Sequence, residues 1–144
     1  MIDRLQEKDI DQVAQIEAEI FSVPWSIKSF KDALASEQNI YLKAETDGQI
    51  VGYCGIWTSF ESADLCNIAV KKEFRKAGLG QKLLEAGIQE AAAKGVERIL
   101  LEVRQSNKAA IRLYEKNGFK CTSVKDNYYH DGASAYCMQR PVTE

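Results

Sequence analysis

Hydrophobic and polar residues follow two different periods along the chain, which together predict a mixture of helices and strands. Two segments near the start, Asp9 to Phe21 and the stretch after Ser26, have the three- and four-residue spacing of amphipathic helices. Ser26 is also a residue type that caps helix N-termini. The apolar stripes are Val13, Ile16 and Ile20 in the first segment and Ile27, Phe30 and Leu34 in the second.

Shorter apolar runs between turn residues predict strands. Asp47-Gly48 separates two of these runs and is a strong signal for a β-hairpin. The expected strands are Ile2 to Leu5, Ile40 to Glu45, Ile50 to Trp57, Leu65 to Val70, Ile99 to Arg104, Phe119 to Val124 and Ala135 to Arg140.

Two further helices are expected in the second half of the chain. The first runs from Leu79 to Lys94 and ends at Gly95. The second follows Ser106 and Asn107, either of which can cap it, and ends at Gly118 before apolar Phe119 in the manner of a Schellman motif. Strands and helices then alternate as β-α-β-α, so the pattern predicts a mixed α/β sandwich.

Length and composition are typical of one compact domain spanning residues 1–144, because a chain of 144 residues buries roughly two thirds of its unfolded surface. The 19 basic and 21 acidic residues give a net charge of −2, which does not favour nucleic-acid binding. No apolar run approaches the roughly 20 residues of a membrane span. No repeat or linker divides the chain.

The cysteines and the single histidine do not suggest a metal site. Cys54, Cys66, Cys121 and Cys137 form no CxxC pair, and His130 has no second imidazole nearby in the sequence. A cysteine nucleophile would need an activating base, and His130 lies in a polar turn. We expect reduced thiols and, since no secretory leader is visible at Met1, a cytoplasmic location.

The segment from Arg75 to Gly80 joins a predicted strand to a predicted helix and has the features of an anion-binding loop. Gly78 and Gly80 allow close approach of the backbone, and the amides that open the next helix attract phosphate. Its spacing matches neither the Walker nor the Rossmann pattern. Taken alone, the segment is equally consistent with a basic surface loop that turns on glycine.

Glu102 and Tyr114, both downstream of this loop, are candidates for acid–base chemistry. Glu102 lies inside the apolar run Ile99 to Arg104, where a carboxylate must be paired, protonated or directed into a wet cleft. The alternative is an outward-facing strand residue on the same side as Leu100. Tyr114 lies on the apolar side of its helix, so the residue pattern alone favours an ordinary core tyrosine.

These segments together resemble the GCN5-related N-acetyltransferase (GNAT) superfamily, and most closely its bacterial ribosomal-protein alanine N-acetyltransferases. The similarity covers nearly the whole chain, and Pro24-Trp25-Ser26 and Asn127-Tyr128-Tyr129 support the narrower match. Its main motifs, in order, are Asn67-Ile68-Ala69-Val70, Arg75-Lys76-Ala77-Gly78-Leu79-Gly80, Leu101-Glu102-Val103-Arg104 with Ser106-Asn107, and Ala110 through Tyr114 to Gly118-Phe119.

The resemblance implies a GNAT fold, with a central, mostly antiparallel sheet flanked by helices, and acetyl-CoA as cosubstrate without a metal. Ile68, Ala69 and Val70 would pair with the pantetheine arm, and the Val70 amide would polarise the thioester. Asn107 would hold the cofactor arm. Arg75, Lys76, Ala77, Gly78, Leu79, Gly80 and Gln81 would bind the pyrophosphate, and Ala77 stands where close relatives often carry another cation.

The same resemblance implies that Glu102 is the general base, acting directly or through water, and that Tyr114 is the general acid. Direct attack of an amine on a thioester requires both roles. Trp25, Tyr128 and Tyr129 are the expected acceptor-site residues, with packing or hinge roles in loops as the alternative.

Three functions are consistent with these residues. The leading one is acetylation of the N-terminal alanine of a small-subunit ribosomal protein. An α-amine with a pKa of about 8 is easier to deprotonate than a lysine side chain with a pKa of about 10.4, by about 3 kcal/mol. The second function is acetylation of a small amine, with Glu61 and Asp64 in a rim loop, and the third is a silent acyl-CoA-binding module. The sequence does not reveal the oligomeric state.

Overall fold

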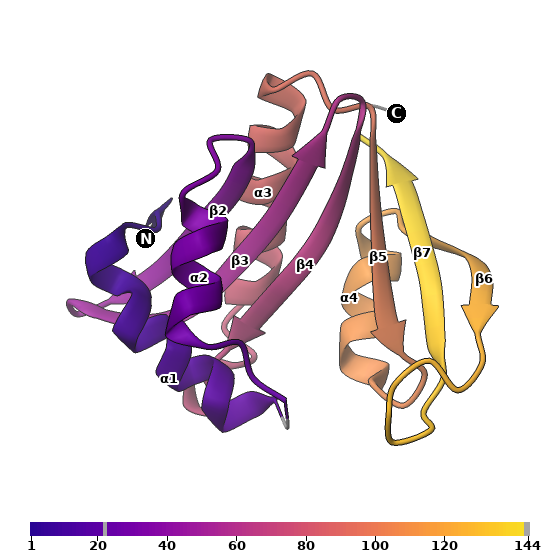
Figure 1. Ribbon diagram of the computed structural model, residues 1–144, viewed down its shortest axis with the longest axis horizontal. Coiled ribbons are helices and arrows are strands. Elements are labelled where there is room, and N and C mark those ends of the chain that lie inside the picture. Colours follow the sequence, from indigo (N-terminus) through magenta and orange to yellow (C-terminus); the bar gives the residue numbers. More distant parts are fainter. Residues whose placement is uncertain (22, 143–144) are drawn as a thin grey trace.

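The computed structural model describes residues 1–21 and 23–142 and contains a seven-stranded sheet with helices on both faces (Figure 1). The strands are β1 (Ile2–Arg4), β2 (Asn39–Thr46), β3 (Gln49–Ser59), β4 (Ser62–Val70), β5 (Arg98–Arg104), β6 (Lys120–Lys125) and β7 (Ala135–Pro141). The α-helices are α1 (Ile10–Ile20), α2 (Ile27–Leu34), α3 (Leu79–Ala93) and α4 (Lys108–Lys116), with short 3₁₀ turns at Glu7–Asp9 and Lys72–Phe74.

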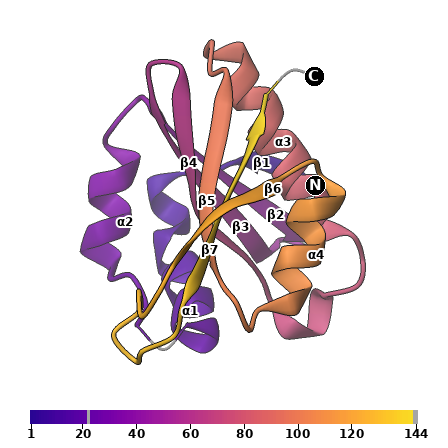
Figure 2. The same ribbon diagram turned by 90° about the vertical axis from the view of Figure 1, so that its right-hand side faces the viewer.

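The strand order is β1-β2-β3-β4-β5-β7-β6, and every neighbouring pair is antiparallel except β4 and β5. Helices α1 and α2 cover one face of the sheet, and α3 and α4 cover the other (Figure 2). This arrangement confirms the predicted mixed α/β fold with a mostly antiparallel sheet.

The parallel pair at the centre of the sheet is short. β4 and β5 pair only through Ser62 with Arg98, Ala63 with Ile99 and Asp64 with Leu100. Beyond these three pairs the two strands spread apart toward the bottom of the view in Figure 1. The rest of β4 therefore keeps β3 as its strand neighbour but has none on its other edge.

A β-bulge lies where β4 leaves β5. Gly55 of β3 is paired with Asn67, and the next residue, Ile56, is paired with Leu65, so Cys66 is the extra residue. A bulge reverses the alternation of side chains and bends the strand. Leu65 accordingly joins the core under α3, whereas Asn67 faces the opposite side and reaches Tyr41.

Each face of the sheet has its own hydrophobic core, and both use the predicted helical stripes. Under α1 and α2, Val13, Ile16 and Phe30 are completely buried. The core under α3 and α4 is built from alternate strand residues and from both helices, including Ala63, Leu65, Leu83, Leu84, Ile99, Leu101, Val103, Tyr114 and Phe119.

The predicted helix ends are confirmed by hydrogen bonds. The Ser26 side chain accepts from the Ser29 amide at 3.1 Å, and Asn107 rather than Ser106 caps α4 by accepting from Ala110 at 3.2 Å. At the other end of α4, the Phe119 amide donates to the Tyr114 carbonyl at 3.0 Å, as in a Schellman motif. These bonds fix the position of Tyr114 within its helix.

The main error in the predicted elements concerns β4, which begins at Ser62 rather than Leu65. Ser62, Ala63 and Asp64 are small or polar and lack the composition of a strand, yet they make all of the pairs with β5. Asp64 therefore lies in a strand and not in the rim loop where we expected it. Glu61 does lie in the turn between β3 and β4.

Gly55 provides the space for the Tyr41 ring, which lies across β3. A Cβ atom at position 55 would lie 2.3 Å from Cε1 of Tyr41, and Tyr41 is only 4% exposed. The ring therefore has little room to move away. The Tyr41 hydroxyl forms hydrogen bonds with both Trp57 of β3 and Asn67 of β4, and so connects these two strands beside the site described below.

We expect Gly55→Ala to lower the free energy of unfolding by about 1–3 kcal/mol, because the new methyl group overpacks against a buried ring. Gly80→Ala is the matched control, since its Cβ would make only an ordinary 3.6 Å contact with Leu113. Urea unfolding of both variants measures the difference. Equal midpoints for Gly55→Ala and the unaltered protein would show that Tyr41 can shift without loss.

Candidate active site

The unpaired edge of β4 presents backbone groups to the opening beside β5. The Lys71 amide bonds the Val51 carbonyl of β3 at 2.8 Å. Because successive residues of a strand direct their backbone groups to opposite edges, Val70 and Ile68 direct theirs away from β3. The Val70 carbonyl accepts from Nε of Arg75 at 2.9 Å. The remaining groups can pair with an extended ligand that carries amides.

The glycine loop at the start of α3 has the geometry of an anion site. Lys76 and Gly78 have positive φ angles of 71° and 79°, and Gly78 is the N-cap, with no side chain capping the helix. The first amides of α3, from Leu79 to Gln81, have no partner within the helix. Arg75, Lys76, Ala77 and Gly78 are exposed. A diphosphate fits these free amides and the two cations.

Only the backbone of Gln81 is available to such a ligand. Its side-chain amide donates to Oδ1 of Asn117 at 2.7 Å and accepts from Nδ2 of Asn117 at 2.8 Å, joining α3 to α4. Asn107 is exposed, and its Oδ1 caps α4. The Asn107 amide nitrogen points to no acceptor among the described residues.

Glu102 lies on the open face of β5, with Leu100 and not with the buried Leu101. Its side chain faces away from the core and is 34% exposed. Oε1 accepts from the Tyr128 hydroxyl at 2.7 Å, and Oε2 accepts from Nζ of Lys125. Partial burial raises the pKa of Glu102, but the hydrogen bonds from Lys125 and Tyr128 outweigh it and hold the pKa below its usual range.

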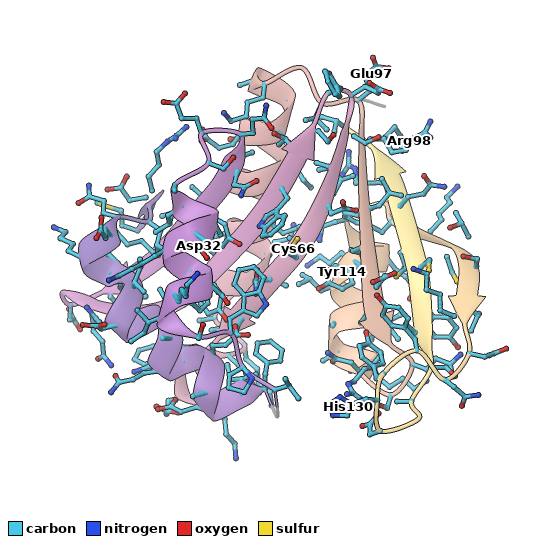
Figure 3. The ribbon with its side chains drawn as sticks, in the orientation of Figure 1. Asp32, Cys66, Glu97, Arg98, Tyr114 and His130 are labelled. Carbon is cyan, nitrogen blue, oxygen red and sulfur yellow. The ribbon has the colours of Figure 1, made fainter. Side chains whose placement is uncertain are left out.

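Tyr114 has a buried ring and an accessible hydroxyl. The residue is 6% exposed and its ring packs against Phe119, with centroids 5.8 Å apart. The hydroxyl bonds no described residue, yet no fully buried side-chain oxygen or nitrogen in the described part lacks a partner. The hydroxyl therefore reaches the surface, at the opening between β4 and β5 (Figure 3). Burial, followed by the proximity of Cys54 and Tyr129, raises its pKa.

The two neighbouring tyrosines of the β6–β7 loop have different environments. Tyr128 bonds Glu102, and Nζ of Lys125 lies 4.8 Å from the centre of its ring. Tyr129 stacks under the Arg104 guanidinium, whose carbon lies 4.2 Å from the ring centre. The two rings meet edge to face at 5.1 Å. The predicted acceptor residues Tyr128 and Tyr129 thus lie beside Glu102 and Arg104.

Trp25, the third predicted acceptor residue, belongs to a separate aromatic cluster. Its ring lies 5.2 Å from Phe30 and 5.9 Å from Trp57, and its backbone amide donates to Glu17 at 3.1 Å. Glu17 is buried and also accepts from the Tyr53 hydroxyl. A groove of about 620 Å³ opens here, lined by Trp25, Ser29, Asp32, Ala33, Ser36, Gln38, Asn39, Trp57, Thr58, Ser59 and Asp64.

Several residues of the site were not singled out by the sequence. Lys125 contacts Glu102, but a lysine at the end of an exposed strand carries no signal of this role. Tyr41 accepts from Nε1 of Trp57 at 2.8 Å and bonds Oδ1 of Asn67 at 3.4 Å, linking the aromatic cluster to the bulge in β4. Alternation identifies Tyr41 only as a core residue, so its bonds became visible only in the folded chain.

Within residues 1–21 and 23–142, no three acidic, cysteine or histidine side chains group as metal ligands. Helices long and apolar enough to cross a bilayer are also not found in that part of the chain. The arrangement brings Glu102 of β5, whose pKa is lowered, and the Tyr114 hydroxyl, whose pKa is raised, to one opening beside unpaired strand amides and the glycine loop before α3. These groups suit transfer of an acyl group from a phosphate-bearing donor to an amine.

Comparison with known proteins agrees with this chemistry. The acetyltransferase (GNAT) family model matches residues 10–119. A Bacillus subtilis (strain 168) protein named as a candidate ribosomal protein bS18-alanine N-acetyltransferase is 40% identical over 139 residues, covering 95% of this chain and 92% of that protein. The bS18-alanine N-acetyltransferase of Salmonella typhimurium (strain LT2) is 38% identical over 125 residues, covering 87% of this chain and 84% of that protein.

A crystal structure of the ribosomal-protein alanine N-acetyltransferase from Escherichia coli has the same fold. It superposes with a TM-score of 0.91 at 34% identity, covering 100% of this chain and 94% of that one. The resemblance found in the sequence is thereby confirmed. The chain belongs to the GNAT acetyltransferase family and, within it, groups with the bacterial ribosomal-protein alanine N-acetyltransferases.

Proposed function

We propose that this acetyl-CoA-dependent N-acetyltransferase acetylates the N-terminal alanine of a small-subunit ribosomal protein, with residues 1–144 acting as one catalytic domain. The names of its relatives support this acceptor. Two observations support the proposal: Glu102 follows the last β5 residue that is paired with β4, and the Tyr114 hydroxyl reaches the surface at the opening between these strands.

The donor would bind along the edge of β4 and at the start of α3. The backbone groups of Ile68 and Val70, on either side of Ala69, would pair with its pantetheine amides, as an added strand pairs with a sheet edge. Arg75 through Gln81 would bind the pyrophosphate through backbone amides, with Arg75 and Lys76 supplying positive charge. Asn107, with its amide nitrogen free, would donate to the donor arm. The Val70 amide would stabilise the developing oxyanion.

Glu102 and Tyr114 would divide the proton transfers. A lowered pKa keeps Glu102 ionised at neutral pH, where it can attract the amine and accept a proton directly or through water. A raised pKa keeps the Tyr114 phenol protonated, as a general acid for the departing thiolate must be. Because Glu102 is a weak base, an α-amine suits it better than the more basic amine of lysine.

The acceptor would enter between the β6–β7 loop and the loop that joins α1 to α2. Tyr128 and Tyr129 would line one side, next to Glu102. Trp25 would line the other, held in place by the bond from its amide to Glu17.

For Glu102→Gln, we expect kcat at neutral pH to fall by roughly a hundredfold, because a general base contributes about 10²–10⁴-fold. Affinity for acetyl-CoA should stay nearly unchanged, since the donor contacts other residues. Steady-state kinetics and calorimetric titration with acetyl-CoA measure the two quantities. Glu115→Gln, an exposed change on α4, is the control. Full activity of Glu102→Gln would remove Glu102 from the mechanism.

For Tyr114→Phe, we expect the rate of acetyl transfer in a single turnover to fall by about 10²-fold through loss of the acid. The free energy of unfolding should change little, because the ring still packs against Phe119. Rapid-quench kinetics and urea unfolding test the two expectations. An unaltered single-turnover rate would leave Tyr114 as a core residue without a chemical role.

The acceptor itself can be tested by CoA release with a ribosomal-protein-derived peptide that bears a free N-terminal alanine. Its N-blocked counterpart with an internal lysine, and a panel of polyamines and aminoglycosides, are the comparisons. We expect thiol release with the free α-amine alone, because a weakly basic carboxylate favours the less basic amine. Release with polyamines but not with the peptide would contradict the proposed acceptor.

A further inference from the structure

The groove beside α2 is joined to the proposed catalytic opening through Asp64. On β4 this residue is paired with Leu100 of β5, and Glu102 follows Leu100 by two residues on the same face. Two residues of a strand span about 6.6 Å. The negative charge of Glu102 contributes to the raised pKa of Asp64, so the two carboxylates are close enough to interact.

Asp64 has an aromatic neighbour suited to a cation. Its partner on β3 is Trp57, and directly paired residues of neighbouring strands have side chains on the same face at close range. Trp57 is 41% exposed, so part of its ring is open to a ligand. A guanidinium group can stack on an aromatic ring while it bonds a carboxylate, which an ammonium group cannot do with the same geometry.

The charged side chains that line the groove are all acidic among the described residues. Its lining includes two carboxylates, Asp32 and Asp64, and no lysine or arginine among the described residues. Asp32 is already paired with Lys28 at 3.0 Å, whereas Asp64 takes part in no ion pair within the described part of the chain. Burial, and then the charge of Glu102, raises the pKa of Asp64, as expected for a carboxyl that has no cationic neighbour.

We propose that Asp64 and Trp57 form a subsite for an arginine side chain of the acceptor peptide, at position two or three counted from the N-terminal residue that is acetylated. This inference rests on the proposed peptide acceptor. An extended peptide advances about 3.3–3.6 Å per residue, so an arginine at either position can reach Asp64 while the N-terminus lies at Glu102. The subsite would make the enzyme selective for acceptors with a basic N-terminal segment.

The test compares two peptides that begin with alanine and differ only at positions two and three, which are arginine in one and citrulline in the other. Citrulline keeps the shape of arginine and removes its charge. We expect kcat/KM to be roughly threefold to fivefold higher for the arginine peptide, as for a partly exposed ion pair. The preference should weaken at high salt.

Asp64→Asn should bring the ratio of the two kcat/KM values close to one. Asp32→Asn is the matched control, because it removes the other carboxylate of the groove and should keep the preference. Equal kcat/KM values for both peptides with the unaltered enzyme, or a preference that persists in Asp64→Asn, would overturn the inference.

Binding gives a second measurement that does not depend on catalysis. The chain has two tryptophans, Trp25 and Trp57, and both line the groove, so their fluorescence reports peptide binding there. If neither peptide is acetylated, the proposed acceptor fails, and the dissociation constants still test the subsite. Tighter binding of the arginine peptide that is lost in Asp64→Asn would support the subsite, and equal constants would refute it.

Discussion

The site depends on the separation of β4 from β5 after only three paired residues. In a continuous sheet, the outer backbone groups of Ile68 and Val70 would bond the neighbouring strand and would not be free for a ligand. The bulge at Cys66 lies at the point of separation and turns the remaining part of β4. The opening that results is lined by the free edge of β4, by Glu102 of β5 and by the hydroxyl of Tyr114.

The surroundings of the two proposed catalytic groups shift their pKa values in opposite directions. Donors from Lys125 and Tyr128 stabilise the charged form of Glu102, whereas burial without a bonded partner stabilises the neutral form of Tyr114. The lysine and Tyr128 come from the end of β6 and the loop that follows it. This segment therefore stabilises the charged form of Glu102 and lies beside the proposed entrance for the acceptor.

The proposed acceptor side of the site is connected to the sheet through buried polar contacts. Glu17 holds the Trp25 amide, and the Tyr41 hydroxyl joins Trp57 to Asn67 at the bulge. Such contacts are directional, and a buried polar group that loses its partner is destabilising by about 1–3 kcal/mol. The aromatic wall of the groove and the strand beside the proposed donor site are consequently positioned by one connected set of contacts.

The sequence by itself determined the helices, most strands, the two ends of α4 and the glycine turn before α3, because these features depend on local periodicity and on residues such as Ser26, Gly78 and Gly118. It left open whether Ser106 or Asn107 caps α4, which the structure assigns to Asn107. It also identified the family through motifs in a fixed order. Only the tertiary structure decided that β4 begins at Ser62, that Lys125 and Tyr128 contact Glu102, and that Asp64 lies beside Trp57. These features depend on strand pairing and on contacts between distant segments, which local residue patterns do not encode.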